Sequence, residues 1–152
     1  MHKLTRTLFT VALLACLAQG CGGPPSAPEE ELRAWVARVI EAAENKERRE
    51  LMEMVAAAYV DARGNERDDI EGMLRVYFLR QNRIALLPKI EEITIYDETA
   101  GKIVMTVGMA GTNDGTLGFS ADAYRFALEL EKAGDEWQLI SARWGELGDE
   151  LR

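Results

Sequence analysis

The spacing of apolar residues changes once along this chain, and that change limits the folds open to it. From residue 29 to 83, apolar residues recur every three or four positions, as they do on one face of a helix. After Pro88 they alternate with other residues, as they do in strands that bury one face of a sheet. Helices followed by a run of strands predict an α+β domain, with helices packed on an antiparallel sheet.

The helical part divides into three segments. The patterns predict helices over residues 29–45, 47–58 and 66–83. Acidic residues open the first segment, where the positive end of a helix dipole favours them. Asn65 precedes the third segment, so we expect it to act as the N-cap. Pro88 marks the change from helices to strands.

Strands are expected around residues 93–96, 103–110, 124–131 and 137–144. The turns between them are "DETAG", the glycine-rich "GTNDGTLGFS" and "AGD". We interpret "GTNDGTLGFS" as a plain loop, because it lacks GxGxxG, a following lysine and the alternating oxygen ligands of a calcium loop. The sequence shows no internal repeat and no second domain, and 152 residues are enough for one core.

Apolar matching predicts the register of the last hairpin. It pairs Lys132 with Glu136 across "AGD". The same register places Arg125 opposite Arg143, where two like charges are destabilising. Three arrangements would offset this repulsion: solvent around splayed side chains, a carboxylate from another element, or an anion bound by both guanidinium groups.

Two segments of the chain resemble a known family. "IEAAENKERRELMEMVAAAYVDARGNERDDIEGML" resembles the opening of a nuclear transport factor 2-like domain, and "GDEWQLISARW" resembles its closing hairpin. The resemblance covers about residues 29–147 and rests on the order of elements. It implies three N-terminal helices packed on a strongly curved antiparallel sheet of about four to six strands, with a pocket inside the resulting cone.

The N-terminal segment reads as an export signal. "MHKLTRT" is basic, and "LFTVALLACLA" is apolar but shorter than the roughly 20 residues that span a bilayer. "AQGC", which ends at Cys21, resembles the lipobox of bacterial lipoproteins. Cys16 also fits that pattern, but cleavage there would leave a shorter apolar region. We therefore expect a signal peptide (1–20), a lipidated cysteine with a Gly/Pro linker (21–28) and the domain (29–152).

The resemblance to lipoproteins implies acyl chains on Cys21 that hold the protein on a membrane. In such lipoproteins an aspartate after the cysteine favours the inner membrane, whereas here Gly22 follows. We expect a protein of the bacterial cell envelope, anchored by lipid in the outer membrane and facing the periplasm.

Charge and residue content exclude several function classes. The formal net charge is −8, and it becomes more negative once Lys3 and Arg6 are removed, so nucleic acid is not an expected partner. His2, Cys16 and Cys21 all lie at the N-terminus. The remaining chain lacks the residues for Ser-His-Asp catalysis, Cys-His catalysis or a Cys/His zinc site. We expect no metal and no cofactor.

These observations favour a binding or scaffold domain that takes a small apolar or anionic ligand or a protein partner. A second copy of the chain, bound through the sheet, is one such partner. We expect a pocket between the first helix and the sheet. Its candidate ligand-binding residues are Trp35, Tyr59, Tyr77, Met105, Tyr124 and Trp144, with Arg125 and Arg143 as an anion-binding pair.

The alternative is an enzyme that resembles isomerases, cyclases or hydrolases and uses pocket Asp, Tyr and Arg residues. Ketosteroid isomerase, in the family that this chain resembles, uses a carboxylate base and a helix-borne tyrosine. The family pattern places Val39 at the tyrosine position and Arg63 near the carboxylate position. Asp61 is offset by two residues, which on a strand returns to the same face. We interpret Asp61 as a solvated turn residue and expect no catalytic residue.

Overall fold

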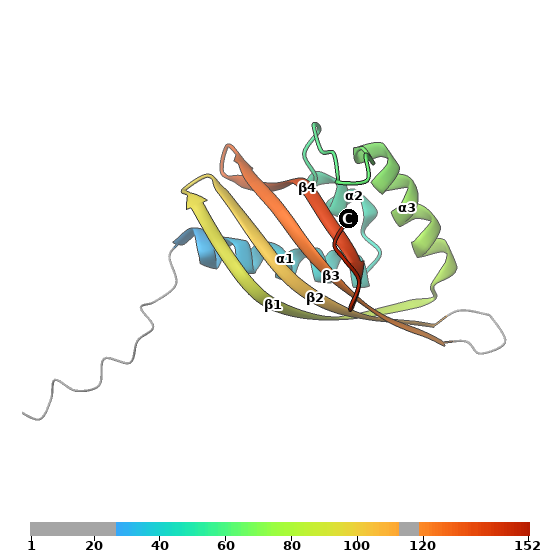
Figure 1. Ribbon diagram of the computed structural model, residues 1–152. Coiled ribbons are helices and arrows are strands. Elements are labelled where there is room, and N and C mark those ends of the chain that lie inside the picture. The colour runs from blue at the N-terminus through green and yellow to red at the C-terminus, as the bar shows by residue number, and fades with distance from the viewer. Residues whose placement is uncertain (1–26, 113–118) are drawn as a thin grey trace, which may run out of the picture.

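The computed structural model describes residues 27–112 and 119–152 (Figure 1), and the side chains of residues 119 and 120 are not described. The predictions for Cys16, Cys21 and the middle of "GTNDGTLGFS" lie outside these residues. The described residues form three helices, α1 (Ala27–Glu44), α2 (Arg48–Glu53) and α3 (Arg67–Arg80), and four strands, β1 (Arg83–Asp97), β2 (Ala100–Thr112), β3 (Phe119–Ala133) and β4 (Glu136–Glu146). The α+β class and the antiparallel sheet are confirmed, with strand order β1-β2-β3-β4.

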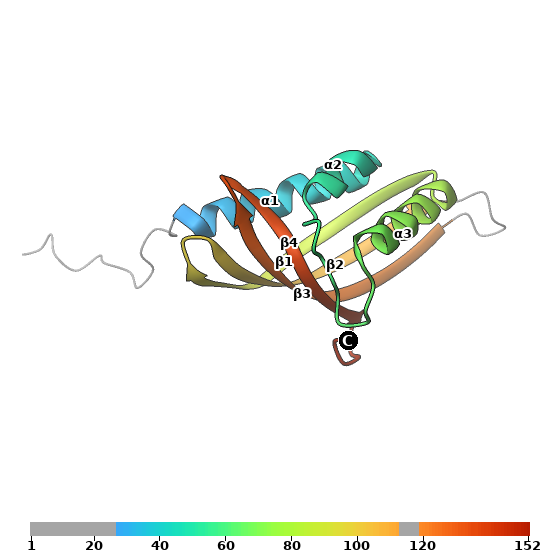
Figure 2. The same cartoon turned by 90° about the horizontal axis from the view of Figure 1, so that it is seen from above.

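The sheet is strongly curved, and all the described helices lie on its concave side (Figures 1 and 2). α1 packs into one end of this concavity, while α3 stands across the other end. Leu32 of α1, Ile103 of β2 and Leu130 of β3 are the most deeply buried side chains of the core. In the described part of the chain, no helix is long and apolar enough to cross a membrane.

The second helix ends earlier than expected. The sequence predicts a helix over 47–58, but α2 ends at Glu53 and the next residues run parallel to β4, with a bridge between Val55 and Leu139. The amide of Ala56 donates to the Leu139 carbonyl at 3.0 Å, and the amide of Ala62 donates to the Ala142 carbonyl at 3.1 Å. These bonds satisfy edge groups of β4, which a continued helix would leave unpaired.

The start of α3 also differs from expectation. Asn65 is not the N-cap; Glu66 occupies that position, and its amide donates to the Asp69 carboxylate at 2.9 Å. Asn65 is instead bonded to Asp61. α3 ends at Arg80, three residues before the predicted end.

β1 begins before Pro88 rather than after it. The strand starts at Arg83 and continues through Pro88, which pairs with Val107 of β2. β1 is at the edge of the sheet, so the missing amide hydrogen of proline can face away from β2 without loss of a ladder hydrogen bond.

The register of the last hairpin is not the predicted one. The turn contains only Gly134–Asp135, and Ile140, an extra residue in β4 opposite Glu129 and Leu130, shifts the pairing again. Arg125 consequently lies opposite Gly145, and Arg143 lies opposite Ala127. The two arginines do not face each other, so the register on which the anion-binding pair was based is wrong.

A close approach between α1 and β2 depends on Gly101. A Cβ at this position would lie 2.9 Å from Cδ1 of Leu32 and 3.1 Å from the Thr94 carbonyl oxygen. Both distances are shorter than ordinary contacts, and neither neighbour is free to move, because Leu32 is fully buried and Thr94 meets Gly101 through its backbone. The glycine therefore sets how deeply α1 enters the concavity.

We predict that Gly101→Ala lowers the free energy of unfolding by about 1–3 kcal/mol, because the added methyl overpacks this contact. Gly108→Ala is a matched control on the same strand, since a Cβ there would meet Leu87 at an ordinary 3.6 Å. The control should change stability by less than about 1 kcal/mol. Urea denaturation measures both, and equal losses would contradict the proposed role of Gly101.

Candidate functional site

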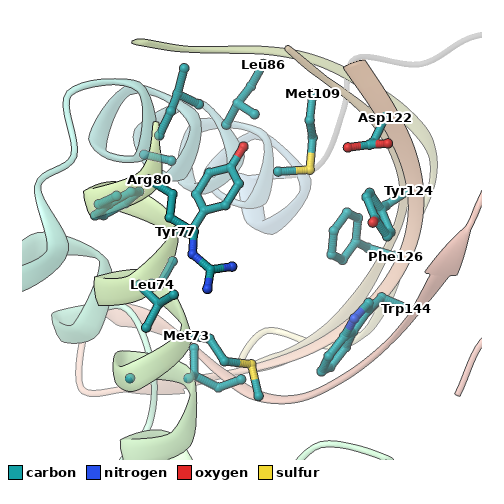
Figure 3. Close-up of a pocket in the computed structure, with 16 residues that line it drawn as sticks. Met73, Leu74, Tyr77, Arg80, Leu86, Met109, Asp122, Tyr124, Phe126 and Trp144 are labelled. Carbon is teal, nitrogen blue, oxygen red and sulfur yellow. The ribbon is translucent and has the colours of Figure 1, made fainter. Parts of the chain in front are cut away.

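A cavity of about 840 Å³ lies between α3 and the concave face of the sheet (Figure 3). α3 is described along its whole length, and no residue in it is fully buried. Ile70 and Leu74 pack against the edge of the core while still partly exposed, so the helix covers the sheet only loosely. The labelled lining residues in Figure 3 are Met73, Leu74, Tyr77, Arg80, Leu86, Met109, Asp122, Tyr124, Phe126 and Trp144.

The two walls follow from the periods of their elements. On α3, Ile70, Leu74 and Tyr77 are three or four residues apart and share one helical face. On β3, alternate residues from Asp122 to Phe126 point to the same side of the sheet. Phe126 faces Trp144 of β4, which extends the aromatic wall across the next strand.

A smaller chamber of about 280 Å³ lies deeper in the fold. It shares five lining residues with the outer cavity, namely Ala43, Ile70, Leu74, Phe126 and Trp144. The two spaces are therefore adjacent. Trp35, Val39 and Tyr59 line only the inner chamber. The indole nitrogen of Trp35 is buried and has no hydrogen-bond partner among the described residues.

Of the two spaces, only the outer cavity has charged lining residues, Arg80 and Asp122. Burial raises the pKa of Tyr77, and the nearby Asp122 carboxylate raises it further. Burial likewise raises the pKa of Tyr124, with Asp122 as the next cause. Both hydroxyls are thus neutral donors at ordinary pH. Arg80 on α3 and Asp122 on β3 stand on facing walls (Figure 3).

Among the described residues, no group of three or more His, Cys, Asp or Glu is placed to hold a metal ion.

No protein-family profile matches this chain, and no curated protein is significantly similar to it. Solved structures do match. A candidate scytalone dehydratase from Novosphingobium aromaticivorans superposes with a TM-score of 0.71 at 10% identity, over 81% of this chain and 85% of that one. A ketosteroid isomerase-like protein from Erwinia carotovora atroseptica gives 0.64 at 12% identity, over 79% and 96%.

A candidate dehydratase of the nuclear transport factor 2-like family, from Streptomyces avermitilis, gives a TM-score of 0.69 at 10% identity, over 80% of this chain and 98% of that one. The fold is that of nuclear transport factor 2-like proteins. At these identities the likeness concerns the fold alone, and a fold does not determine an activity.

The nuclear transport factor 2-like cone brings some of the candidate residues together. Tyr77, Tyr124 and Trp144 line the outer cavity, and Trp35, Tyr59 and again Trp144 line the inner chamber. Met105 is packed in the core instead. The inner chamber lies between α1 and the sheet, where the pocket was expected, because Trp35 and Val39 of α1 line it. The outer cavity, between α3 and the sheet, was not expected.

Sequence reasoning missed Arg80 and Asp122. The alternation on β3 extends back from Tyr124 to Asp122, so the period could have placed Asp122 beside Tyr124. No local signal could have placed Arg80 across from it, because their approach depends on how α3 stands over the sheet.

Arg125 is paired with a carboxylate from another strand. Its Nε and Nη2 donate to Oε2 of Glu91 at 3.0 and 2.8 Å, and the Thr106 hydroxyl donates to Oε1 of Glu91 at 2.6 Å. The hydrogen bonds from Thr106 and Arg125 lower the pKa of Glu91. The sequence left three arrangements open for Arg125: solvent, a carboxylate from another element, or a bound anion. The structure shows the second, with Glu91 of β1 as the carboxylate.

Asp61 is a buried turn residue, not the solvated one expected. Its side chain is only 5% exposed. It accepts the amide of Arg63 at 2.8 Å, the amide of Asn65 at 2.9 Å and the side-chain amide of Asn65 at 2.8 Å. Burial alone would raise the pKa of Asp61, but these hydrogen bonds outweigh it and lower the pKa. Asp61 lines neither chamber.

Arg63 fixes the position of Trp144. Its guanidinium carbon lies 4.6 Å from the centre of the indole ring, and its Nη2 donates to the Trp144 carbonyl at 3.1 Å. The Asp61 turn holds the backbone of Arg63. Through Arg63, the turn therefore helps to hold Trp144, which borders both chambers.

We predict that Asp61→Ala lowers the free energy of unfolding by about 1–3 kcal/mol at pH 7, because it leaves partly buried amides without their acceptor. Asp61→Asn keeps an acceptor for the two backbone amides and should cost less. The folded pKa of Asp61 is lowered, so the carboxylate's contribution is present above its unfolded pKa of about 3.9 and is lost as pH falls through the folded value.

The stability advantage of wild type over Asp61→Asn should therefore be nearly constant from about pH 7 to 5 and shrink as pH falls below about 4. Denaturant unfolding at several pH values measures it. A difference that stays constant below about pH 4 as well would show that the charged form of Asp61 does not contribute.

Proposed function

We propose that this protein is a lipid-anchored protein of the bacterial envelope whose cone-shaped domain binds an apolar ligand rather than catalysing a reaction. One observation carries the binding part of this proposal. The outer cavity of about 840 Å³ and the adjacent chamber of about 280 Å³ give the domain a largely apolar, aromatic-walled space. Ligand-binding pockets are typically of this size and character.

The exposure of apolar side chains beside the cavity supports this proposal. Met73 is 46% exposed and Val76 is 47% exposed, and both line the outer cavity. A ligand in the cavity would remove this apolar surface from water, which is favourable at about 25 cal/mol per Å².

The positions that carry catalysis in ketosteroid isomerase favour binding as well. Val39, at the tyrosine position of the resemblance, lines the inner chamber without a polar group. Asp61 is near the carboxylate position, but both of its oxygens accept hydrogen bonds from Arg63 and Asn65 in its own turn. A general base needs a carboxylate within reach of the substrate, and Asp61 does not meet that condition.

A second candidate function is proton transfer on an apolar substrate. It rests on one observation, the Asp122 carboxylate acting electrostatically on the hydroxyls of Tyr77 and Tyr124 within the same cavity. Structural neighbours named for dehydratase and isomerase activities make such chemistry worth testing. Turnover of a cyclic ketone substrate that Asp122→Asn abolishes would favour this function over simple binding.

The proposed anchor agrees with the placement of the domain. α1 begins at Ala27, six residues after Cys21, so a lipid on Cys21 would hold the start of α1 close to the membrane. α3 lies at the opposite end of the domain from the start of α1 (Figures 1 and 2). Anchoring there would leave α3 and the cavity beside it away from the attachment point.

We predict that Leu74→Trp weakens ligand binding at least about tenfold, because Leu74 borders both chambers and a larger side chain would obstruct them. Leu79→Trp is the matched control on the same helix, since Leu79 is 81% exposed and lines neither chamber. The probe is 1-N-phenylnaphthylamine, whose fluorescence rises in apolar sites. Circular dichroism checks the fold of both variants, and equal binding by the two would contradict the cavity as the site.

We predict that Cys21→Ala abolishes labelling of the protein by radioactive palmitate in a bacterial host and leaves the precursor uncleaved. Cys16→Ala is the control and should label and mature normally. Palmitate labelling that persists in Cys21→Ala and disappears in Cys16→Ala would move the anchor to Cys16.

A further inference from the structure

Two opposite charges face the same cavity, and neither has a partner among the residues that the structure describes. Arg80 extends from α3 towards the cavity interior, and Asp122 stands on the β3 wall across from it (Figure 3). Neither side chain forms a hydrogen bond or an ion pair with any residue in the described part of the chain. By contrast, Arg67 at the start of α3 donates to the carbonyls of Met52 and Val55.

These charges limit what can fill the outer cavity. A ligand that covers Arg80 and Asp122 removes water from both. Desolvation of a charge that gains no partner is unfavourable and would weaken binding. An uncharged ligand would compensate neither group. A ligand with one charge would pair with one group and meet the like charge of the other.

Resting on the proposed binding function, we infer that the ligand is an amphiphile with a zwitterionic head. Its anionic group pairs with Arg80, whose planar guanidinium suits the oxygens of a phosphate or carboxylate. Its ammonium group pairs with Asp122, on the same cavity wall as the aromatic rings of Tyr124, Phe126 and Trp144. The head thus lies across the outer cavity, between α3 and β3.

The apolar tail of such a ligand has a defined place. Leu74 and Trp144 border both chambers, so a chain that passes between them leads from the outer cavity into the inner chamber. The inner chamber is lined by Val39, Leu51 and other apolar residues, and it suits a hydrocarbon tail. The domain therefore has a polar part for the head and an apolar end for the tail.

A set of amphiphiles with one tail and different heads tests this inference. The probes are dodecylphosphocholine, dodecyl phosphate, dodecyltrimethylammonium and the neutral dodecyl maltoside, each below its micelle concentration. Isothermal titration calorimetry with the full chain carrying Cys21→Ala avoids competition from acyl chains at that position. Dodecylphosphocholine should bind about tenfold more tightly than the neutral probe.

The variants Arg80→Gln and Asp122→Asn assign the two charges. Arg80→Gln should weaken dodecylphosphocholine binding about three- to tenfold and favour the cationic probe. Asp122→Asn should weaken it similarly and favour the anionic probe. Arg75→Gln on α3 and Glu131→Gln on β3 are matched controls outside the cavity lining, and they should not change the order of the probes.

The outcomes separate the two levels of the proposal. Binding of every probe with equal affinity, or an unchanged order of probes in both cavity variants, would overturn the zwitterionic head and leave apolar binding standing. Failure of all the probes, including dodecyl maltoside, to bind would overturn the binding function itself. Circular dichroism and the unfolding temperature confirm that each variant is folded.

Discussion

The close packing of α1 against β2 determines where this fold has room. Leu32 meets the backbone at Gly101, where a side chain would not fit, and the helix settles into one end of the curved sheet. The curvature continues beyond the reach of α1. The far end is covered by α3, which stands across it without a fully buried residue along its described length. The cavity is the space that remains when one helix fits closely and the next does not.

Trp144, which lines both chambers, is held in place by residues that line neither chamber. Asp61 organises a turn, the turn places Arg63, and Arg63 lies over the indole of Trp144 while bonding its carbonyl. A single buried carboxylate therefore acts at a distance on the shape of the site. Its low pKa reflects a structural function, and a perturbed pKa alone would not have distinguished this from a catalytic one.

The sequence predicted those parts of the fold that depend on local periodicity. The helices and strands follow from the spacing of apolar residues, and their order was enough to suggest the cone. The end of α2 was missed because its continuation gains hydrogen bonds from β4, which lies far away in the sequence. The start of β1 was missed because Pro88 interrupts an interior strand but not an edge strand.

The register of the last hairpin failed for a related reason. Apolar matching assumes a regular ladder, whereas this hairpin has a shorter turn and an extra residue in β4, Ile140, that together move Arg125 away from Arg143. The aromatic lining was partly foreseen, since Tyr77, Tyr124 and Trp144 are apolar-face residues of their own elements. The opposition of Arg80 and Asp122 joins a helix to a strand and has no signature within either segment.

The edges of the sheet bear on how this protein behaves at high concentration. Along β4, backbone groups of Leu139, Ile140 and Ala142 are bonded to the segment that follows α2. Along β1, the amide of Leu86 donates to the Glu44 carboxylate at 2.8 Å, and Pro88, two residues on, has no amide hydrogen to offer. Strand addition needs a continuous row of free donors and acceptors. Over these stretches the sheet presents no such row, which disfavours growth of the fold into cross-β aggregates where copies are crowded together.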